Sequence, residues 1–320
     1  GGWSEERQAM NIAILGAGAM GSLFGGYLTR GNEVYLVDVN AARVEAIERE
    51  GVWIHEQDGT EGQYRPHAVT DAAGLPEMDL VIVFVKAMHT ESALSANRAL
   101  IGPETYLMTL QNGAGHEARL LRYADRDHVI IGTTLHNGSL LENGHVNHGG
   151  GGQTTIGLLG GASERIEHIA KALSACALSC STSDQVRRQI WSKLFLNTAA
   201  SSLTAILQVP LGFILEDAHA RGMMRRLAQE AVAVANAEGL GEPFDAEEVI
   251  AGIETVLANA RGGYTSIYAD VRAGARSEVD TISGSVVEAA KAAGVAAPCH
   301  EMVVSLIHAL EHRNAQEGKA

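Results

Sequence analysis

The most constraining feature of the chain is a glycine-rich turn that lies between two short apolar segments. An apolar run at Ile12–Leu15 leads into the turn, and a second at Glu33–Val37 ends at an acid, Asp38. The turn reads Gly16-Ala17-Gly18-Ala19-Met20-Gly21. The first glycine of such a turn permits a tight bend, the second lets backbone N–H groups approach a pyrophosphate, and the third lets helix and strand pack closely. The stretch therefore predicts a strand–turn–helix–strand unit that holds a dinucleotide at a helix N-terminus.

The residues around Asp38 indicate which dinucleotide is bound. A carboxylate at this position can accept hydrogen bonds from the adenosine ribose hydroxyls, whereas sites for NADP usually place an arginine nearby. Here Val39 and Asn40 follow Asp38, and the first basic residue is Arg43. Because a carboxylate repels a phosphate at close range, Asp38 and Val39 favour NAD(H). NADP(H) stays open at this point, since Arg43 could still reach the phosphate.

Length and composition exclude several classes of protein. A chain of 320 residues can bury two domain cores, and its net charge of −14 argues against a nucleic-acid-binding surface, which needs a basic stripe. No apolar run approaches the roughly 20 residues of a membrane span, so we expect no membrane association. The three cysteines are too few for a disulfide framework and fit a reducing compartment, which predicts a cytoplasmic protein. They are Cys176, Cys180 and Cys299.

The pattern of apolar residues divides the chain into two parts. Strand-like runs alternate with helical stretches in residues 10–183, and Leu80–Val85 is typical of a buried parallel strand. We expect Gly144–Gly152 to form a glycine-rich turn, flanked by segments that could pair as a β-hairpin. The prediction for this part is an α/β, Rossmann-like domain with a doubly wound parallel sheet. Residues 1–9 are expected to be an N-terminal extension or tag remnant.

Residues 184–320 show almost no strand pattern and predict an all-α domain that carries substrate-binding and catalytic residues. The expected helices are Asp184–Leu207, Ala218–Glu238, Ala246–Ala260, Ser277–Ala293 and His300–Glu311. Ligands of open α/β sheets bind beyond the carboxyl ends of the strands. We therefore expect the active site where that edge of the sheet faces the helical domain.

Several polar side chains could carry chemistry at this edge. Lys86 and Asn112 each follow a predicted strand, where Lys86 could neutralise a cofactor phosphate and Asn112 could bind the nicotinamide ribose or a substrate oxygen. Both could equally cap turns. His145 and His148 stand beside glycines with no cysteine nearby, so no metal site is expected.

The helix around Lys193 carries a more specific pattern. Lys193, Asn197 and Ser201 are spaced by four residues and would share one face of an α-helix. A lysine buried among apolar neighbours shifts its pKa readily, which suits proton transfer. The alternative is a surface lysine on a helix that connects the domains. Farther along, Ser266 and Glu278 could meet a small acid, or could be a helix cap and a solvated charge.

Together these motifs resemble the ketopantoate reductase family over nearly the whole chain from Met10. The resemblance rests on the order and spacing of Gly16–Gly21, Val85-Lys86-Ala87, Gln111-Asn112-Gly113-Ala114-Gly115, Gly132-Thr133-Thr134, Lys193-Leu194-Phe195-Leu196-Asn197, Leu203-Thr204-Ala205-Ile206, Thr265-Ser266 and Glu278-Val279-Asp280. It implies reduction of a 2-oxo acid by NAD(P)H, by default ketopantoate (2-dehydropantoate) in pantothenate biosynthesis, to the R-2-hydroxy acid.

The resemblance also implies roles for individual residues. Lys193 matches the family's proton donor, Glu278 the glutamate that orients the lysine and cofactor, and Asn112 the asparagine at the junction of nicotinamide and substrate. The other matched positions are Asn197 and Ser266, which hold substrate, and Lys86 on the cofactor side. Ser201 stands where the family carries a second asparagine, and we expect it to contact substrate too.

Departures from the family pattern open two other hypotheses. Val39 aligns with an arginine for the NADP phosphate, and Leu211 with a substrate-binding asparagine. These changes suggest an NAD-dependent 2-hydroxyacid dehydrogenase of the same family with a different, bulkier substrate. The third hypothesis is a catalytically silent dinucleotide sensor, against which Lys193 and Glu278 both argue. The helical domain is compatible with a homodimer.

Overall fold

The structure is a computed structural model that describes residues 9–318, so all but the last residue of the predicted N-terminal extension lies outside it. The chain forms two compact units. The first comprises residues up to Gln111 together with His116–Val186, and the second comprises Asn112–Gly115 together with the chain from Arg187 onward. The short insert Asn112–Gly115 thus belongs to the second unit although the segments on both sides of it belong to the first.

The first unit is built on an eight-stranded sheet with the order β12-β11-β8-β7-β6-β1-β2-β5. Every pairing is parallel except that of β8 with β11, so the predicted parallel sheet carries one antiparallel pair. The strands are β1 (Asn11–Leu15), β2 (Glu33–Val37), β5 (His67–Val69), β6 (Leu80–Val83), β7 (Tyr106–Thr109), β8 (Val129–Thr134), β11 (Thr154–Leu158) and β12 (Cys180–Thr182).

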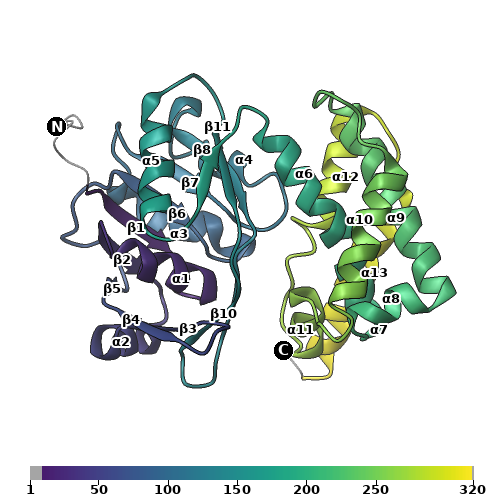
Figure 1. The fold of residues 1–320 in the computed structure, drawn as a ribbon, viewed down its shortest axis with the longest axis horizontal. Helices are drawn as coiled ribbons and strands as arrows, with labels where there is room; N and C mark the ends of the chain where they lie inside the picture. Colours follow the sequence, from purple (N-terminus) through teal and green to yellow (C-terminus); the bar gives the residue numbers. More distant parts are fainter. Residues whose placement is uncertain (1–8, 319–320) are drawn as a thin grey trace. The chain divides into compact units, whose positions relative to one another are not determined.

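Helices cover this sheet, and the central strands are apolar because both of their faces are buried (Figure 1). All four residues of β6 are buried, as expected for a parallel strand inside a doubly wound sheet. The helices of the unit are α1 (Ala19–Leu28), α2 (Ala41–Glu50), α3 (Thr90–Ala96), α4 (Glu117–Leu120) and α5 (Glu164–Ala175), with short 3₁₀ turns η1 (Ala87–His89), η2 (Arg98–Leu100) and η3 (Arg126–His128).

A second, four-stranded sheet goes beyond the expected β-hairpin. Its order is β4-β3-β10-β9, formed by β3 (Val52–His55), β4 (Glu61–Tyr64), β9 (Asn137–Leu140) and β10 (Val146–Gly150). The antiparallel pairing of β9 with β10 supplies the expected hairpin. The expectation that Gly144–Gly152 is a turn is therefore wrong for β10. Val146 and His148 are buried while Asn147 between them is exposed, and this period-two pattern is hidden by the surrounding glycines.

The described part of the second unit is helical. It contains α6 (Val186–Leu196), a π-helical turn η4 (Asn197–Ser201), α7 (Ser202–Leu207), α8 (Leu211–Glu216), α9 (Ala218–Ala237), α10 (Ala246–Asn259), α11 (Ser266–Arg272), α12 (Ser283–Ala293) and α13 (Pro298–Gln316). The helix predicted for Asp184–Leu207 is thus interrupted at η4, and the one predicted from Ser277 begins only at Ser283. None of the helices in residues 9–318 combines the length and the apolar character needed to cross a bilayer.

A partly buried carboxylate joins two helices of this unit. Glu230 on α9 accepts hydrogen bonds from the backbone N–H groups of Cys299 (3.1 Å) and His300 (2.9 Å), and from the Nδ1 of His300 (2.7 Å). These donors lie in the first turn of α13, whose N–H groups have no partner within the helix. Burial alone would raise the pKa of Glu230, but the hydrogen bonds from His300 and Cys299 outweigh it and lower the pKa to about 2.

We predict that Glu230→Gln lowers the free energy of unfolding by about 2–3 kcal/mol at neutral pH, because the anion that α13 requires is lost. The folded-state pKa lies below the ordinary value of 4.5, so this stabilisation is present above pH 4.5 and is lost as the pH falls towards 2. Urea unfolding followed by circular dichroism should therefore separate the variant from the parent at pH 7 but not near pH 2. Glu288→Gln, at an exposed surface pair, should differ little at either pH.

Candidate active site

The glycine-rich turn has the shape that a dinucleotide pyrophosphate needs. Gly16 has φ +106°, and a Cβ there would lie 2.8 Å from the backbone N of Val85. A Cβ on Gly21 would lie 1.8 Å from the carbonyl oxygen of Gly16, so only glycine permits this close packing. Around Gly18 a Cβ would meet no atom within 4 Å, and no side chain caps the N-terminus of α1 at this residue. The open space and the helix N-terminus fit the phosphates of a nicotinamide dinucleotide.

Asp38 is held beside this turn by the backbone. Its Oδ2 accepts a hydrogen bond from Ala17 N (2.8 Å) and its Oδ1 from Asn40 N (2.9 Å). Val39 beside it is 90% exposed. Since β2 ends at Val37, the carboxylate lies just beyond the carboxyl end of a strand, where the ribose of a bound dinucleotide is recognised.

Arg43 is anchored to the structure around the turn. Its Nε donates to Ala17 O (3.0 Å), and its two terminal nitrogens donate to Gly144 O (2.6 Å) and to the Oγ of Ser22 (2.9 Å). Burial lowers the pKa of this guanidinium, while the Asp38 carboxylate opposes that shift. For Arg43 to pair with a 2′-phosphate, it would have to give up these hydrogen bonds.

Lys86 and Gln111 lie just beyond the ends of two other strands, β6 and β7. Lys86 is exposed and directly precedes η1, shortly after β6 ends. Gln111, to which the sequence assigns no role, donates from Nε2 to Val85 O (2.7 Å) and to Thr90 Oγ1 (2.9 Å). These bonds tie the end of β7 to the segment after β6, so Gln111 positions the chain immediately before Asn112.

The histidines near the glycines belong to hydrogen-bonded pairs. His148 contacts Glu56 through Nδ1 (2.7 Å) and His136 through Nε2 (3.0 Å), and His145 contacts His55 (2.8 Å). Within residues 9–318 no group of three or more ligating side chains is placed to hold a metal ion.

Asn112–Gly115 is fixed to the helical unit through a backbone contact. Ala114 N donates to Thr281 O (3.0 Å), and Gly113 has φ +86°. A Cβ on Gly113 would lie 1.8 Å from Thr281 O and 2.5 Å from the carbonyl carbon of Thr281. The segment can dock this closely only because residue 113 is glycine, and that docking sets the position of Asn112.

Lys193, on α6, contacts Asn112 within the same unit. Its Nζ donates to Asn112 Oδ1 at 3.0 Å. Burial lowers the pKa of Lys193 from 10.5 to about 8. An amide oxygen accepts a hydrogen bond without a negative charge, so it orients the ammonium while leaving the pKa low. A lysine with a pKa near 8 is protonated at neutral pH and can still release its proton, as a general acid requires.

The chain after Lys193 departs from the predicted geometry. The four-residue spacing that predicts a shared face holds from Lys193 to Asn197, but η4 begins at Asn197 and its wider winding breaks the α-helical register before Ser201. The turn is anchored to the first residue of α12, because Thr198 and Ser202 both hydrogen-bond to the Oγ of Ser283, at 3.2 and 2.9 Å. Such π-helical turns are frequent at functional sites.

The start of α11 lies against this part of the chain. Thr265 caps α11 and accepts from Tyr268 N (3.1 Å), and its Oγ1 also lies 2.8 Å from Thr204 Oγ1 and 3.5 Å from Ser201 O. Ser266 follows as the first residue of the helix and is exposed. Ser201 and Ser266 therefore belong to neighbouring segments of the same unit.

Glu278 lies in the turn that precedes α12. Its carbonyl oxygen accepts from the N–H groups of Thr281 (3.1 Å) and Ile282 (3.2 Å). The carbonyl of Thr281 is the one that holds Ala114, so the Glu278 turn and the Asn112 segment are built together.

Comparison with known proteins agrees with this architecture. The family described as "Ketopantoate reductase PanE/ApbA" matches residues 12–161, and the family described as "Ketopantoate reductase PanE/ApbA C terminal" matches residues 185–311. The chain belongs to the ketopantoate reductase family. This is a family of NAD(P)-dependent oxidoreductases that act on CH–OH groups.

Relatives in this family match the chain over nearly their whole length. The 2-dehydropantoate 2-reductase of Halobacterium salinarum is 33% identical, with 93% of this chain and 98% of the relative covered. That of Lactococcus lactis is 31% identical, with 94% and 98% covered. Among solved structures, a D-mandelate dehydrogenase with NADH and anilino(oxo)acetate has a TM-score of 0.88 at 32% identity, covering 96% of this chain and 100% of that one. A PanE/ApbA family ketopantoate reductase from Ralstonia eutropha has a TM-score of 0.86 at 30% identity, with 96% and 100% covered.

We predict that Gly113→Ala lowers kcat about 100-fold, because its Cβ must push Asn112 away from Lys193 and misplacement by about 1 Å has that effect on catalysis. Gly115→Ala provides a matched control, since Gly115 has a similar φ of +84° but a Cβ there would meet nothing within 4 Å. Both variants carry the same backbone strain of about 1–2 kcal/mol. Steady-state kinetics should thus separate them, and equal loss of activity in both would contradict the docking argument.

Proposed function

We propose that this member of the ketopantoate reductase family reduces a 2-oxo acid to the R-2-hydroxy acid with NADH, with 2-dehydropantoate as the default substrate. The observation that carries the proposal is the Lys193 ammonium, with its pKa lowered to about 8 and its Nζ held 3.0 Å from Asn112 Oδ1. Family membership supplies the reaction class, and this pair supplies the group that the reaction needs.

The roles of the chain's own residues follow from their chemistry. A bound nicotinamide supplies the hydride that reaches C2 of the oxo acid. Lys193 Nζ donates a hydrogen bond to the carbonyl oxygen, stabilises the negative charge that develops there, and transfers its proton as the alcohol forms. Asn112 orients Nζ through its amide oxygen. From the family match, we assign to Glu278 the role of orienting the lysine and the cofactor. Asn197, Ser201 and Ser266 are assigned to hold the substrate.

The proposed preference for NADH rests on Asp38, Val39 and Arg43. The Asp38 carboxylate accepts two backbone hydrogen bonds at the turn, which hold it where a 2′-phosphate would bring further negative charge. Val39 supplies no positive charge, and Arg43 is engaged by Ala17 O, Gly144 O and Ser22. The remaining cofactor contacts are assigned to Gly16–Gly21 and Lys86.

A second candidate substrate is a bulkier 2-oxo acid with an aromatic or branched side chain. Leu211 replaces a polar residue of the family, and its Cδ1 would lie 3.4 Å from a Cβ on Gly263, three residues before Ser266. Leu211 N also donates to Gly263 O (3.0 Å), so the apolar side chain is fixed beside the Ser266 segment. The similarity to a D-mandelate dehydrogenase with NADH supports the same alternative. In that case the protein is an NAD-dependent 2-hydroxyacid dehydrogenase.

The proposal also covers the cellular compartment and the oligomeric state of the protein. Three free cysteines fit a reducing environment, and we assign the enzyme to the cytoplasm. The partner is a small-molecule acid. The helical unit is also proposed to support a homodimer, which sedimentation of the purified protein would test.

Initial rates with NADH and NADPH against a set of 2-oxo acids test this proposal. We predict that NADH is favoured over NADPH by about tenfold or more, which corresponds to about 1.4 kcal/mol of phosphate repulsion. The set should include 2-dehydropantoate, branched 2-oxo acids and phenylglyoxylate. A preference for the branched or aromatic acids selects the second candidate, and a preference for 2-dehydropantoate selects the first.

Two results would contradict the proposal. A strong preference for NADPH would show that Asp38 does not select the cofactor. Binding of NADH without turnover of any 2-oxo acid would instead indicate the catalytically silent dinucleotide sensor.

A further inference from the structure

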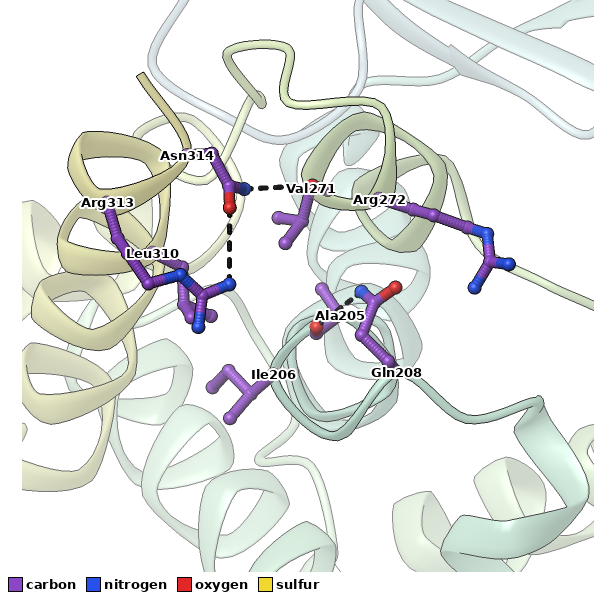
Figure 2. A pocket seen from close by; sticks show the side chains of 8 residues that line it. All are labelled: Ala205, Ile206, Gln208, Val271, Arg272, Leu310, Arg313 and Asn314. Atoms are coloured by element: carbon purple, nitrogen blue, oxygen red, sulfur yellow. Dashed lines mark hydrogen bonds between the residues drawn. The ribbon is translucent and has the colours of Figure 1, made fainter. Parts of the chain in front are cut away.

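A pocket of about 310 Å³ lies between α7, α11 and α13 in the helical unit (Figure 2). None of its lining residues belongs to the Lys193–Asn112 site. The floor is apolar, with Ala205 and Ile206 from α7, Val271 from α11 and Leu310 from α13. Its volume is at the small end of the range of ligand sites, and corresponds to about ten waters or a ligand of about ten non-hydrogen atoms.

Two arginines give this pocket a positive charge. Arg313 on α13 and Arg272 on α11 line it, and Figure 2 shows them on opposite sides, with no acidic residue among the lining side chains. Arg313 donates to Asn314 Oδ1 (3.2 Å), and Arg272 donates to the hydroxyl of Tyr268 (3.2 Å). Both acceptors are neutral.

Three other arginines of the unit form ion pairs with carboxylates instead. Arg221 pairs with Glu254, Arg225 with Glu247, and Arg261 with Glu216. No carboxylate within residues 9–318 lies at ion-pair distance from Arg272 or Arg313. In a chain with a net charge of −14, two arginines without an acidic partner at one pocket indicate that the missing anion comes from outside the chain.

The polar groups of the pocket are already ordered. Asn314 is 2% exposed, and its Nδ2 donates to Val271 O (3.0 Å) while its Oδ1 holds Arg313. Gln208 ends α7 in the left-handed region, with φ +54°, and its Nε2 donates to Ala205 O (2.7 Å). A glutamine in this conformation carries backbone strain, which is common at ligand-binding positions.

We propose that this pocket binds a small aliphatic carboxylate, with the carboxylate on Arg313 and the apolar body on Ile206, Val271 and Leu310. A guanidinium pairs with a planar carboxylate through two parallel hydrogen bonds. The apolar floor selects an organic acid over an inorganic anion, and Arg272 adds positive potential from the other side. None of the lining residues has a role in the reaction assigned to the protein, so the proposal does not depend on that reaction.

Isothermal titration calorimetry with hexanoate tests the proposal on the full chain. We expect saturable binding with one site at this pocket, and Arg313→Gln should weaken it about tenfold or more, since a charge-assisted hydrogen bond contributes about 1.5 kcal/mol or more. Arg226→Gln, an equal change of charge at an exposed position of α9, should leave the affinity unchanged. Arg272→Gln should weaken binding severalfold, and serves as the second test if Arg313→Gln is unstable in thermal unfolding.

Three controls distinguish this pocket from other sources of binding. Lys193→Ala must keep hexanoate binding, because the substrate site also takes carboxylates. Hexylamine, which has a similar shape and the opposite charge, and inorganic phosphate, which has no apolar body, should both bind at least tenfold more weakly. The proposal is overturned if neither arginine variant weakens binding, if Lys193→Ala abolishes it, if phosphate binds as well as hexanoate, or if no binding occurs up to about 20 mM, above the range expected for so small a ligand.

Discussion

The candidate active site depends on the docking of four residues, Asn112–Gly115, into the helical unit. These residues follow β7, yet Ala114 N donates to Thr281 O and Gly113 leaves no room for a side chain between them. This contact brings an amide from the end of a sheet strand to the lysine of a helix, and the 3.0 Å hydrogen bond from Lys193 Nζ to Asn112 Oδ1 results. The close approach of Gly113 to Thr281 therefore helps to fix the amide beside the ammonium.

The partner of Lys193 matters as much as its burial. A carboxylate in the place of the Asn112 amide would favour the charged lysine and raise its pKa. With a neutral oxygen as the acceptor, burial dominates and the pKa falls to about 8. The ammonium is then both oriented and acidic enough to give up its proton.

Much of this was predictable from the sequence, for reasons that differ between the two units. The turn at Gly16–Gly21 and the buried strand β6 leave local signals, since glycine spacing and continuous apolar runs report backbone geometry directly. The alternation that marks β10 is masked by glycines, so the sequence predicts a hairpin here but not the four-stranded sheet. Helix α11 is only seven residues long and gives too short a period to recognise.

The candidate site likewise contains residues with a local sequence signal and residues whose contacts are distant in the sequence. Lys193 stands out because a lysine among apolar residues is unusual. Asn112 is a candidate because it follows a predicted strand, and the family resemblance implies the roles of Asn112 and Glu278. The π-helical turn at Asn197–Ser201 could not be seen, because the residues that anchor it, such as Ser283, are far away in the sequence. Gln111 was missed for the same reason: its hydrogen bonds to Val85 and Thr90 depend on which strands lie side by side.

The most direct test of the central claim is the pH dependence of kcat/KM for 2-oxo acid reduction in the parent enzyme and in Lys193→Ala. If the Lys193 ammonium donates the proton, the parent loses activity as the pH rises through about 8, because the donor is deprotonated there. The variant should be slower by about 10²–10⁴-fold at pH 7, should lack that decline, and should bind NADH with unchanged affinity. A variant that kept the parent's rate and the same decline above pH 8 would show that another group supplies the proton.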